Sequence, residues 1–305
     1  MNLKDRRLLV IVLFMLVTLL FIGRLFQLQV LDEDWKIKAA HITERSVTKY
    51  PSRGVIYDRN GRLLVGNIAV YDLMVVPREV ENLDTLALAK LLSIEPQDFK
   101  KRLNKAKAYS NFKPTAIAKL IPSDEYVNIA EALGSYKGFY GQVRSMRTYP
   151  DHIAAHVLGY ISEVSQKRIE EDSYYHSGDY IGANGVEAVY EESLRGKKGV
   201  EIMLVDVHNN VRGKFEKGIY DTMSVSGKDL TSSLDVELQK YGEALMQNKR
   251  GSVVAIEPAT GEILAMVNNP AYDPNLLVGR VRSHNYSILL SDTLKPFFNR
   301  ALQAK

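Results

Sequence analysis

Two serine–lysine pairs have the spacing that a lysine-activated serine nucleophile requires. On a helix, a Lys three residues after a Ser brings its amine to the hydroxyl and takes the proton. The matches are Ser46–Lys49 and Ser110–Lys113, and Ser283–Asn285 resembles a Ser-x-Asn partner motif. Neither pair begins a buried apolar helix, and no Lys-Thr-Gly or Lys-Ser-Gly sequence follows. We therefore predict that none of these serines is a catalytic nucleophile.

Two histidines, His152 and His156, have the i, i+4 spacing of a helical zinc site. Metalloprotease sites of this kind also need a Glu beside the first His as general base, and here the sequence is His-Ile-Ala-Ala-His. Gly182–Gly185 is too short for a dinucleotide fingerprint, and no phosphate loop is present. We predict two structural histidines, no metal site and no cofactor.

Six charged residues stand inside otherwise apolar segments, and two interpretations of them remain open. They are either a solvated face or a set of ion pairs that joins the segment around residue 57 to a helix at 185–195. A buried pair of this kind fixes geometry better than it adds stability. The six residues are Arg53, Asp58, Arg59, Glu187, Glu191 and Arg195.

The elements that must position these residues begin with a hairpin. Asn60-Gly61 favours a two-residue type I′ turn between alternating strands, and a further strand is expected at Ala69–Pro77. Residues 79–136 read as a helical lobe, in which Asp84 and Ser123 are expected to cap helices and Pro96 to open one. Further expected elements are an extended Phe139–Tyr149, helices at Ile153–Tyr160 and Gly185–Leu194, and a strand buried on both faces at Gly199–Val207.

A change in composition at Ser224–Asp229 predicts a linker. After it we expect a short strand at Leu230–Leu234, a helix capped by Asp235, and a hairpin formed by Gly251–Ile256 and Glu262–Val267. About 75 residues are too few for an independent core of ordinary type. We therefore expect this last part to be an incomplete domain.

An uncharged apolar run, Leu8–Gly23, stands at the N-terminus. With the residues up to about Leu28 it is long enough for a transmembrane helix. Basic residues precede the run and Asp32–Asp34 follow it, which predicts a cytoplasmic N-terminus and an extracytoplasmic bulk. A signal peptidase site of small residues is missing after the run, which favours an uncleaved anchor over a signal peptide.

The composition is that of a globular protein, with 46% hydrophobic and 25% charged residues among 305. The net charge of +4 is spread along the chain without a basic, aromatic-rich patch, so a nucleic-acid partner is not expected. There are no cysteines, which excludes a disulfide scaffold and thiolate metal sites.

An ordered series of segments resembles the class B penicillin-binding proteins. Arg53-Gly-Val-Ile-Tyr-Asp-Arg-Asn-Gly61, Arg147-Thr-Tyr-Pro150 with Ala155–Ile161, and Gly185–Gly196 resemble the three motifs of the family's non-catalytic pedestal. Leu230–Asp235 and Gly251–Asn275 resemble the start of its transpeptidase domain. The likeness covers almost the whole chain and is strongest to the elongation-type enzymes. The motif residues carried over are Arg53, Gly54, Asp58, Arg59, Gly61, Arg147, Tyr149, Pro150, Gly185, Glu187, Tyr190, Glu191, Arg195 and Gly196.

The resemblance implies an α+β fold with three parts. These are a cytoplasmic tip and anchor at 1–30, an elongated pedestal at 31–223, and a linker with the start of an α/β transpeptidase domain at 224–305. It also implies a periplasmic peptidoglycan D,D-transpeptidase of cell elongation in the inner membrane. The family nucleophile follows an Asn-Arg-Ala segment, here Asn299–Ala301, so it is expected just beyond Lys305 and the chain is expected to be inactive.

The implied partners are a polytopic glycan-polymerising glycosyltransferase for the anchor and pedestal, and peptidoglycan stem peptides and β-lactams for the full-length parent. One alternative of a different class stays open, a bitopic extracytoplasmic adaptor or receptor complete at 305 residues. The adaptor would require a closed fold after Ser224.

Overall fold

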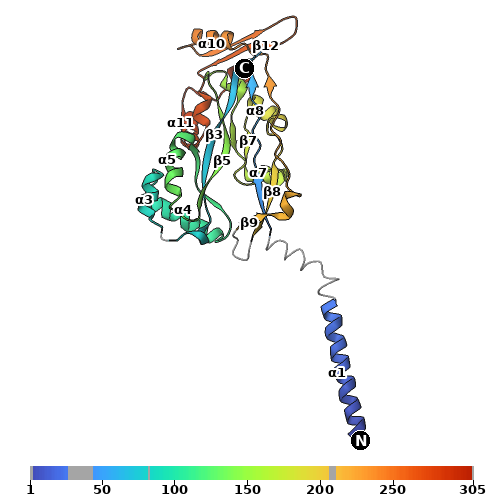
Figure 1. Cartoon of the computed structure of the whole chain (residues 1–305). Helices are drawn as coiled ribbons and strands as arrows, with labels where there is room; N and C mark the ends of the chain where they lie inside the picture. Colours follow the sequence, from blue (N-terminus) through green and yellow to red (C-terminus); the bar gives the residue numbers. More distant parts are fainter. Residues whose placement is uncertain (1–2, 27–43, 82, 206–210, 304–305) are drawn as a thin grey trace. The chain divides into compact units, whose positions relative to one another are not determined.

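The computed structural model describes residues 3–26, 44–81, 83–205 and 211–303 (Figure 1). The chain has an α+β fold and divides into two compact units. The first draws on residues 1–49 and 200–223, and the second on residues 50–199 and 224–305. The predicted boundary between anchor and pedestal at residues 30 and 31, and the end of the predicted anchor near Leu28, lie outside the described residues.

The first unit contains a helix and a three-stranded sheet of order β1-β8-β9. Its elements are α1 (Leu3–Phe26), β1 (Glu44–Lys49), β8 (Gly199–Val205), β9 (Val211–Lys214) and the 3-10 helix η3 (Phe215–Gly218). The carboxylate of Glu201 on β8 accepts contacts from Lys49 Nζ at 2.7 Å and Lys214 Nζ at 2.6 Å. Among its described residues, β8 is half-buried from 200 to 203 and Leu204 is exposed. The expected burial on both faces is therefore wrong, because this small sheet is not enclosed between two packed layers.

None of the helices in the described part of the chain is long and apolar enough to qualify as a membrane span.

The second unit is built on a five-stranded sheet of order β10-β2-β3-β4, with β5 also paired to β3. Its strands are β2 (Ile56–Tyr57), β3 (Leu63–Val75), β4 (Thr115–Pro122), β5 (Phe139–Thr148) and β10 (Leu230–Thr231). The separate strand expected at Ala69–Pro77 is the second half of β3. The two halves join because residues 66–68 stay extended and pair with β5, Gly66 opposite Thr148 and Ile68 opposite Met146.

The hairpin turn differs from the type I′ prediction. Only Gly61 adopts a positive φ (83°), whereas type I′ also requires one at Asn60. Asp58 organises a longer turn, since its Oδ1 accepts from the backbone N–H of Asn60 at 2.8 Å and of Arg62 at 2.7 Å. A side chain that caps its own turn replaces the backbone geometry expected of Asn-Gly.

The helical lobe packs against β3, β4 and β5 (Figure 1). It comprises η2 (Pro77–Glu79), α3 (Thr85–Leu91), α4 (Pro96–Tyr109) and α5 (Ser123–Leu133). Asp84 caps α3 as predicted, accepting from the N–H groups of Leu86 and Ala87. Ser123 does not cap α5; its hydroxyl donates to the carbonyl of Ala69 at 2.7 Å, because the neighbouring strand β3 lies within reach.

The segment between the lobe and β8 is a series of short elements. The helix expected at Ile153–Tyr160 forms only over four residues, because His152 and Ala154 adopt positive φ before it and Gly159 after it. The helix expected at Gly185–Leu194 breaks at Tyr190, whose φ and ψ are −100° and 20°. The elements are α6 (Ala155–Leu158), β6 (Ile161–Glu163), α7 (Gln166–Glu171), β7 (Tyr180–Gly182), α8 (Gly185–Val189) and α9 (Glu191–Leu194).

The last part contains a helix packed on a hairpin, as predicted (Figure 1). Asp235 caps the helix by accepting from Leu238 N–H at 3.0 Å. The predicted linker at Ser224–Asp229 does not run free, because the N–H groups of Val225, Gly227 and Lys228 donate to backbone carbonyls of other segments. The short strand expected at Leu230–Leu234 forms over two residues, and Leu230 pairs with Ile56 in parallel register. The elements are α10 (Val236–Leu245), β11 (Gly251–Ile256), β12 (Ile263–Asn269), η4 (Pro274–Leu277), α11 (Arg282–Ser291) and α12 (Arg300–Gln303).

Candidate functional site: a buried charged junction

Two arginines meet one fully buried carboxylate at the centre of the second unit. Glu187 on α8 is 0% exposed; its Oε1 accepts from Arg147 Nε and its Oε2 from Arg53 Nε, both at 2.7 Å. Arg147 is also 0% exposed and donates from Nη1 to Asn67 Oδ1 at 2.8 Å. Strand β5 thus supplies Arg147, helix α8 supplies the carboxylate that binds it, and strand β3 supplies Asn67 as a second acceptor for Arg147.

The electrostatics of the two arginines differ. Burial lowers the pKa of Arg147, and Glu187 only partly offsets it. Burial acts in the same direction on Arg53, but the carboxylates of Glu187 and Glu191 outweigh it and raise its pKa. Guanidinium groups stay protonated in proteins. Among the described residues, Arg147 Nη2 is buried without a hydrogen-bond partner. The buried charge at the centre of the network is therefore not fully hydrogen-bonded, and its ion pair fixes geometry more than it adds stability.

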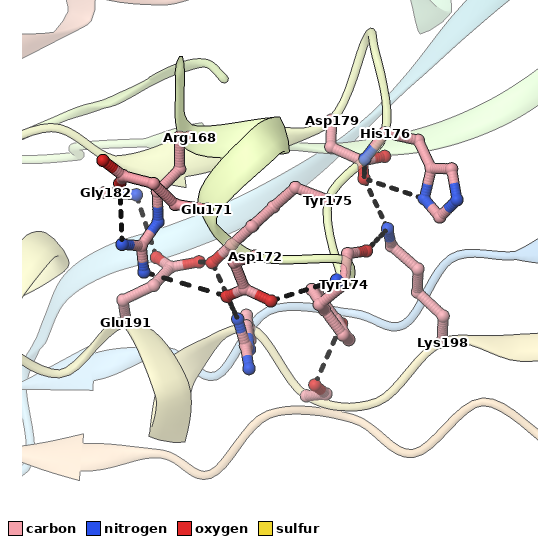
Figure 2. Close-up of polar contacts among 12 residues, drawn as sticks. Arg168, Glu171, Asp172, Tyr174, Tyr175, His176, Asp179, Gly182, Glu191 and Lys198 are labelled. Carbon is pink, nitrogen blue, oxygen red and sulfur yellow. Dashed lines mark hydrogen bonds and ion pairs between the residues drawn. The ribbon is translucent and has the colours of Figure 1, made fainter. Parts of the chain in front are cut away.

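A second carboxylate, Glu191 on α9, extends the network (Figure 2). Its Oε2 accepts from Arg53 Nη2 at 2.5 Å and from Gly182 N–H at 2.8 Å, and its Oε1 accepts from the Tyr175 hydroxyl at 2.9 Å. Arg195 Nη1 donates to the same hydroxyl at 2.9 Å and stacks over the ring of Tyr174. Burial raises the pKa of Tyr175 to about 12, so this phenol stays neutral and links the two charges.

An open pocket adjoins the network. Lys198 is one of the residues that line this pocket, and it donates to the Tyr174 carbonyl and to the carboxylate of Asp179 (Figure 2). The pocket's enclosed space of about 80 Å³ is far below the roughly 300 Å³ of a typical small-molecule site. Charged and aromatic side chains line it, among them Tyr50, Arg53, Arg144, Tyr180 and Arg195.

The junction also holds the predicted linker in place through backbone contacts at glycines. Gly227 N–H donates to Ser52 O, and Gly54 N–H donates to Leu194 O, both at 2.9 Å. A Cβ at Gly54 would lie 2.0 Å from Lys228 O, and one at Gly227 would lie 1.8 Å from Leu194 O. Only glycine lets these three backbones approach so closely.

Residues of the hairpin turn also bond to the start of α10 and to the segment just before it. Asp58 Oδ2 accepts from Val236 N–H at 3.4 Å, and Arg59 N–H donates to Leu234 O at 3.0 Å. Asp151 accepts from Lys240 Nζ at 2.6 Å and from Arg62 at 2.9 Å. The first pedestal motif, Arg53–Gly61, is therefore bonded to the residues that lead into the last part of the chain.

The remaining motif residues have separate roles. The Tyr149 hydroxyl donates to Gly159 O at 2.9 Å, and burial raises its pKa. Gly185 and Gly196 adopt positive φ of 59° and 69° at close backbone contacts. Tyr190 is exposed, Pro150 lies two residues after the end of β5, and Arg59 pairs at the surface with Glu262. The ion-pair interpretation therefore holds for Arg53, Glu187 and Glu191, and the solvated one for Arg59.

The serines and histidines do not assemble a reactive site. The Ser110 hydroxyl accepts from the N–H groups of Phe112 and Lys113, and Lys49 pairs with Glu201. His152 contacts Asp273, and His156 contacts the carbonyl of Pro296. Within the described ranges, no cluster of three or more His, Asp or Glu residues could hold a metal ion. The predicted nucleophile position lies beyond the described residues.

Comparison with protein families accounts for this arrangement. A family model described as the penicillin-binding protein dimerisation domain matches residues 48–232, more than half of the chain. The chain belongs to the penicillin-binding proteins. A second model, the penicillin-binding protein transpeptidase domain, matches residues 251–305. In this chain the charged junction lies within the match to the dimerisation domain, and α10 lies between the two matches.

Curated relatives give the same family. The chain is 33% identical to the peptidoglycan D,D-transpeptidase MrdA of Salmonella typhimurium over 264 residues, which cover 83% of this chain and 41% of the relative. It is 33% identical to the protein of that description from Escherichia coli K12 over 300 residues, which cover 95% of this chain and 47% of the relative. The chain thus spans less than half the length of these relatives.

A solved structure has the same fold over most of the chain. It is described as the complex between penicillin-binding protein 2 (PBP2) and MreC from Helicobacter pylori. The match has a TM-score of 0.65 and 25% sequence identity, and covers 84% of this chain and 49% of that chain.

Sequence reasoning missed several members of the junction. Asn67, Tyr175, Asp179 and Lys198 lie outside the quoted motifs but bond directly to the network or to the pocket wall. One usable signal was the adjacent Tyr174-Tyr175 pair close to an Asp and an Arg, since tyrosines often stack against arginine. Asn67 carried no local signal.

Proposed function

We propose that these residues act within a peptidoglycan D,D-transpeptidase of cell elongation, as the pedestal and the first part of the catalytic domain. The relatives named above support this activity. The observation that carries the pedestal role is the set of backbone contacts that holds residues 225–232, which we call the clamp. In it Gly54 and Gly227 lie at the close backbone contacts described above, and β10 pairs with β2. A linker that is held by such contacts fixes the position of the residues after it relative to the pedestal, whereas a flexible tether would not.

The proposed reaction is two acyl transfers. A serine hydroxyl attacks the penultimate D-Ala carbonyl, an ester forms, the amide bond to the terminal D-Ala breaks, and its nitrogen takes the proton. The amine of a neighbouring stem peptide then attacks the ester, which forms the cross-link and restores the serine. The described residues contribute no nucleophile to this reaction. We propose that they position the domain that contains it.

We also propose a single-pass arrangement in the cytoplasmic membrane, with the N-terminus inside and the bulk in the periplasm. The apolar run Leu8–Gly23 and the basic residues before it support this. The partner proposed for the anchor and pedestal is a polytopic glycan-polymerising glycosyltransferase. The solved PBP2 structure was described in complex with MreC, which supports the coarser proposal that the pedestal binds a protein.

A labelling experiment tests the activity. An antibody raised against residues 50–232 would capture the native polypeptide from membranes of the source cells, and a fluorescent penicillin would then be added. We expect one covalently labelled band that excess unlabelled β-lactam abolishes. The 305-residue chain expressed alone is the control, and we expect it to stay unlabelled. A captured polypeptide that never labels would overturn the proposed activity.

Two further experiments test the partner and the alternative. Co-purification of the chain with the glycosyltransferase should survive replacement of residues 251–305 and fail when residues 8–28 are exchanged for another apolar helix. Limited proteolysis separates the transpeptidase proposal from an adaptor complete at 305 residues. The first predicts rapid cleavage within 251–305 and a resistant core before it, and an adaptor predicts resistance to its end.

A further inference from the structure

A buried arginine stands at the start of α12, and no carboxylate of the described residues pairs with it. Arg300 is 7% exposed, and its guanidinium donates to backbone carbonyls. Nη2 donates to Leu294 O at 2.6 Å, and Nη1 lies 3.2 Å from Phe298 O and 3.4 Å from both Lys295 O and Pro270 O. Within the described residues these four carbonyls are its recorded polar partners. A buried cation is costly, so one that gathers three carbonyls of the loop before α12 and the carbonyl of Pro270 fixes the course of that loop against the end of β12.

A second buried polar side chain holds the same helix start. Asn268, at the end of β12, is 3% exposed, and its Oδ1 accepts from Ala301 N–H at 2.9 Å. The N–H groups of the first helical turn lack partners within the helix. Asn268 Nδ2 is buried and has no hydrogen-bond partner. A buried amide nitrogen without a hydrogen-bond partner lowers the stability of the folded state. The bond to Ala301 is the contribution that offsets this cost.

The pedestal also contacts the loop before α12, residues 292–299. His156 Nε2 lies 2.8 Å from the carbonyl of Pro296. Next to it the ring of Phe297 packs against Tyr272 with centroids 5.0 Å apart, and the Tyr272 hydroxyl donates to Ala155 O. Residues of α6 therefore contact the loop whose carbonyls surround Arg300.

We propose that Arg300 and Asn268 are positioning residues that fix where α12 begins, and thereby the segment that follows it, with His156 linking this position to the pedestal. The inference rests on the proposed function, in which that following segment carries the nucleophilic serine. Neither side chain touches substrate. Their effect is on the placement of the reacting hydroxyl, and a displacement of about 1 Å costs on the order of 100-fold in rate.

The first test uses the 305-residue chain. Amide hydrogen exchange at Ala301 should accelerate at least tenfold in Asn268→Ala. Asn268→Asp, which keeps the acceptor oxygen, should restore protection. Unchanged exchange in Asn268→Ala would overturn the assignment of this bond. This measurement does not depend on activity, so it stands even if the captured polypeptide fails to react with penicillin.

The second test uses the native polypeptide, captured as above from cells that carry the variants. In Arg300→Met and Asn268→Ala, the acylation rate constant for penicillin should fall tenfold or more, while the dissociation constant of the initial complex stays unchanged. Asn268→Asp should recover most of the rate. The same replacement at Arg102, an exposed arginine on α4, is the control and should acylate normally.

The outcomes separate the two proposals. A wild-type polypeptide that does not label ends the proposed function, and exchange at Ala301 then decides the positioning role alone. A wild type that labels, with variants that acylate at the wild-type rate or lose only affinity, overturns the positioning role. Should Arg300→Met fail to fold, Arg300→Lys and the Asn268 variants carry the same test.

Discussion

The charged junction and the helical lobe are held together by opposite means. In the junction, Arg147 and Glu187 are fully buried ions and Arg53 is a half-buried one, and their partners come from separate segments. In the lobe, apolar side chains such as Phe99 and Leu88 are fully buried around one face of the sheet. An apolar core tolerates a change of neighbour of similar volume, whereas an ion pair demands one partner at one distance. The junction therefore specifies geometry, and the lobe stabilises the fold by burying apolar side chains.

The largest expected effect is in the junction. Glu187→Ala leaves two buried guanidinium groups without their shared carboxylate, which should cost about 4 kcal/mol of unfolding free energy. It should also release the linker, so that proteolysis at residues 225–232 accelerates. Chemical denaturation and timed proteolysis measure the two effects. Glu192→Ala, at an exposed acid on the neighbouring helix α9, should change neither. A stable variant with a protected linker would contradict the clamp.

The lobe should respond strongly but locally. Phe99→Ala removes a fully buried ring and leaves a cavity, which should cost about 3 kcal/mol. Because its contacts lie within the lobe, protection of residues 225–232 should not change. Tyr109→Ala, at an exposed position of the same helix, is the control. If Phe99→Ala exposes the linker as Glu187→Ala does, the two regions unfold as one and the contrast between them is wrong.

A smaller effect is expected at the cap of α3. Asp84→Ala removes the acceptor for two backbone N–H groups and should cost about 1 kcal/mol. Asp84→Asn retains an acceptor oxygen and should be close to wild type. Thermal denaturation of the two variants side by side measures the difference. Equal stabilities would show that water satisfies these N–H groups as well as the side chain does.

The smallest effect depends on pH. Burial opposes ionisation of Asp151, but Lys240 and Arg62 outweigh it and hold its pKa below the usual value. The folded protein therefore releases this proton more readily than the unfolded chain. The contribution is complete above about pH 4 and is lost as the pH falls through the folded pKa. Since both partners are partly exposed, it should stay below about 1 kcal/mol.

Replacement of Asp151 tests this sign. Asp151→Asn should be less stable than wild type at pH 7, and the gap in unfolding free energy should close as the pH is lowered towards 3. Glu192→Gln serves as the exposed control, for which no such closing gap is expected. A difference that widens on acidification would reverse the assigned direction.

Local sequence patterns determined most of the secondary structure. Asp84 and Asp235 capped the helices that follow them, and the hairpin of β11 and β12 formed where two strand segments joined by Glu-Pro-Ala-Thr-Gly predicted it. These signals act between residues a few positions apart, so the chain carries them before it folds. The same patterns failed at Asn60-Gly61 and at Ser123. There, Asp58 and a carbonyl of β3 offered better partners than the expected backbone geometry.

Tertiary structure alone decided which charges are buried. The sequence placed Arg53 and Glu187 in family motifs, but these residues are 134 positions apart, and nothing local distinguishes them from the exposed Arg59. Asn67 and Asn268 were invisible for the same reason. A buried ion or amide is tolerated only where folding delivers its counterpart. That delivery depends on the register of β3 against β5 and on the path of the linker, neither of which a local pattern encodes.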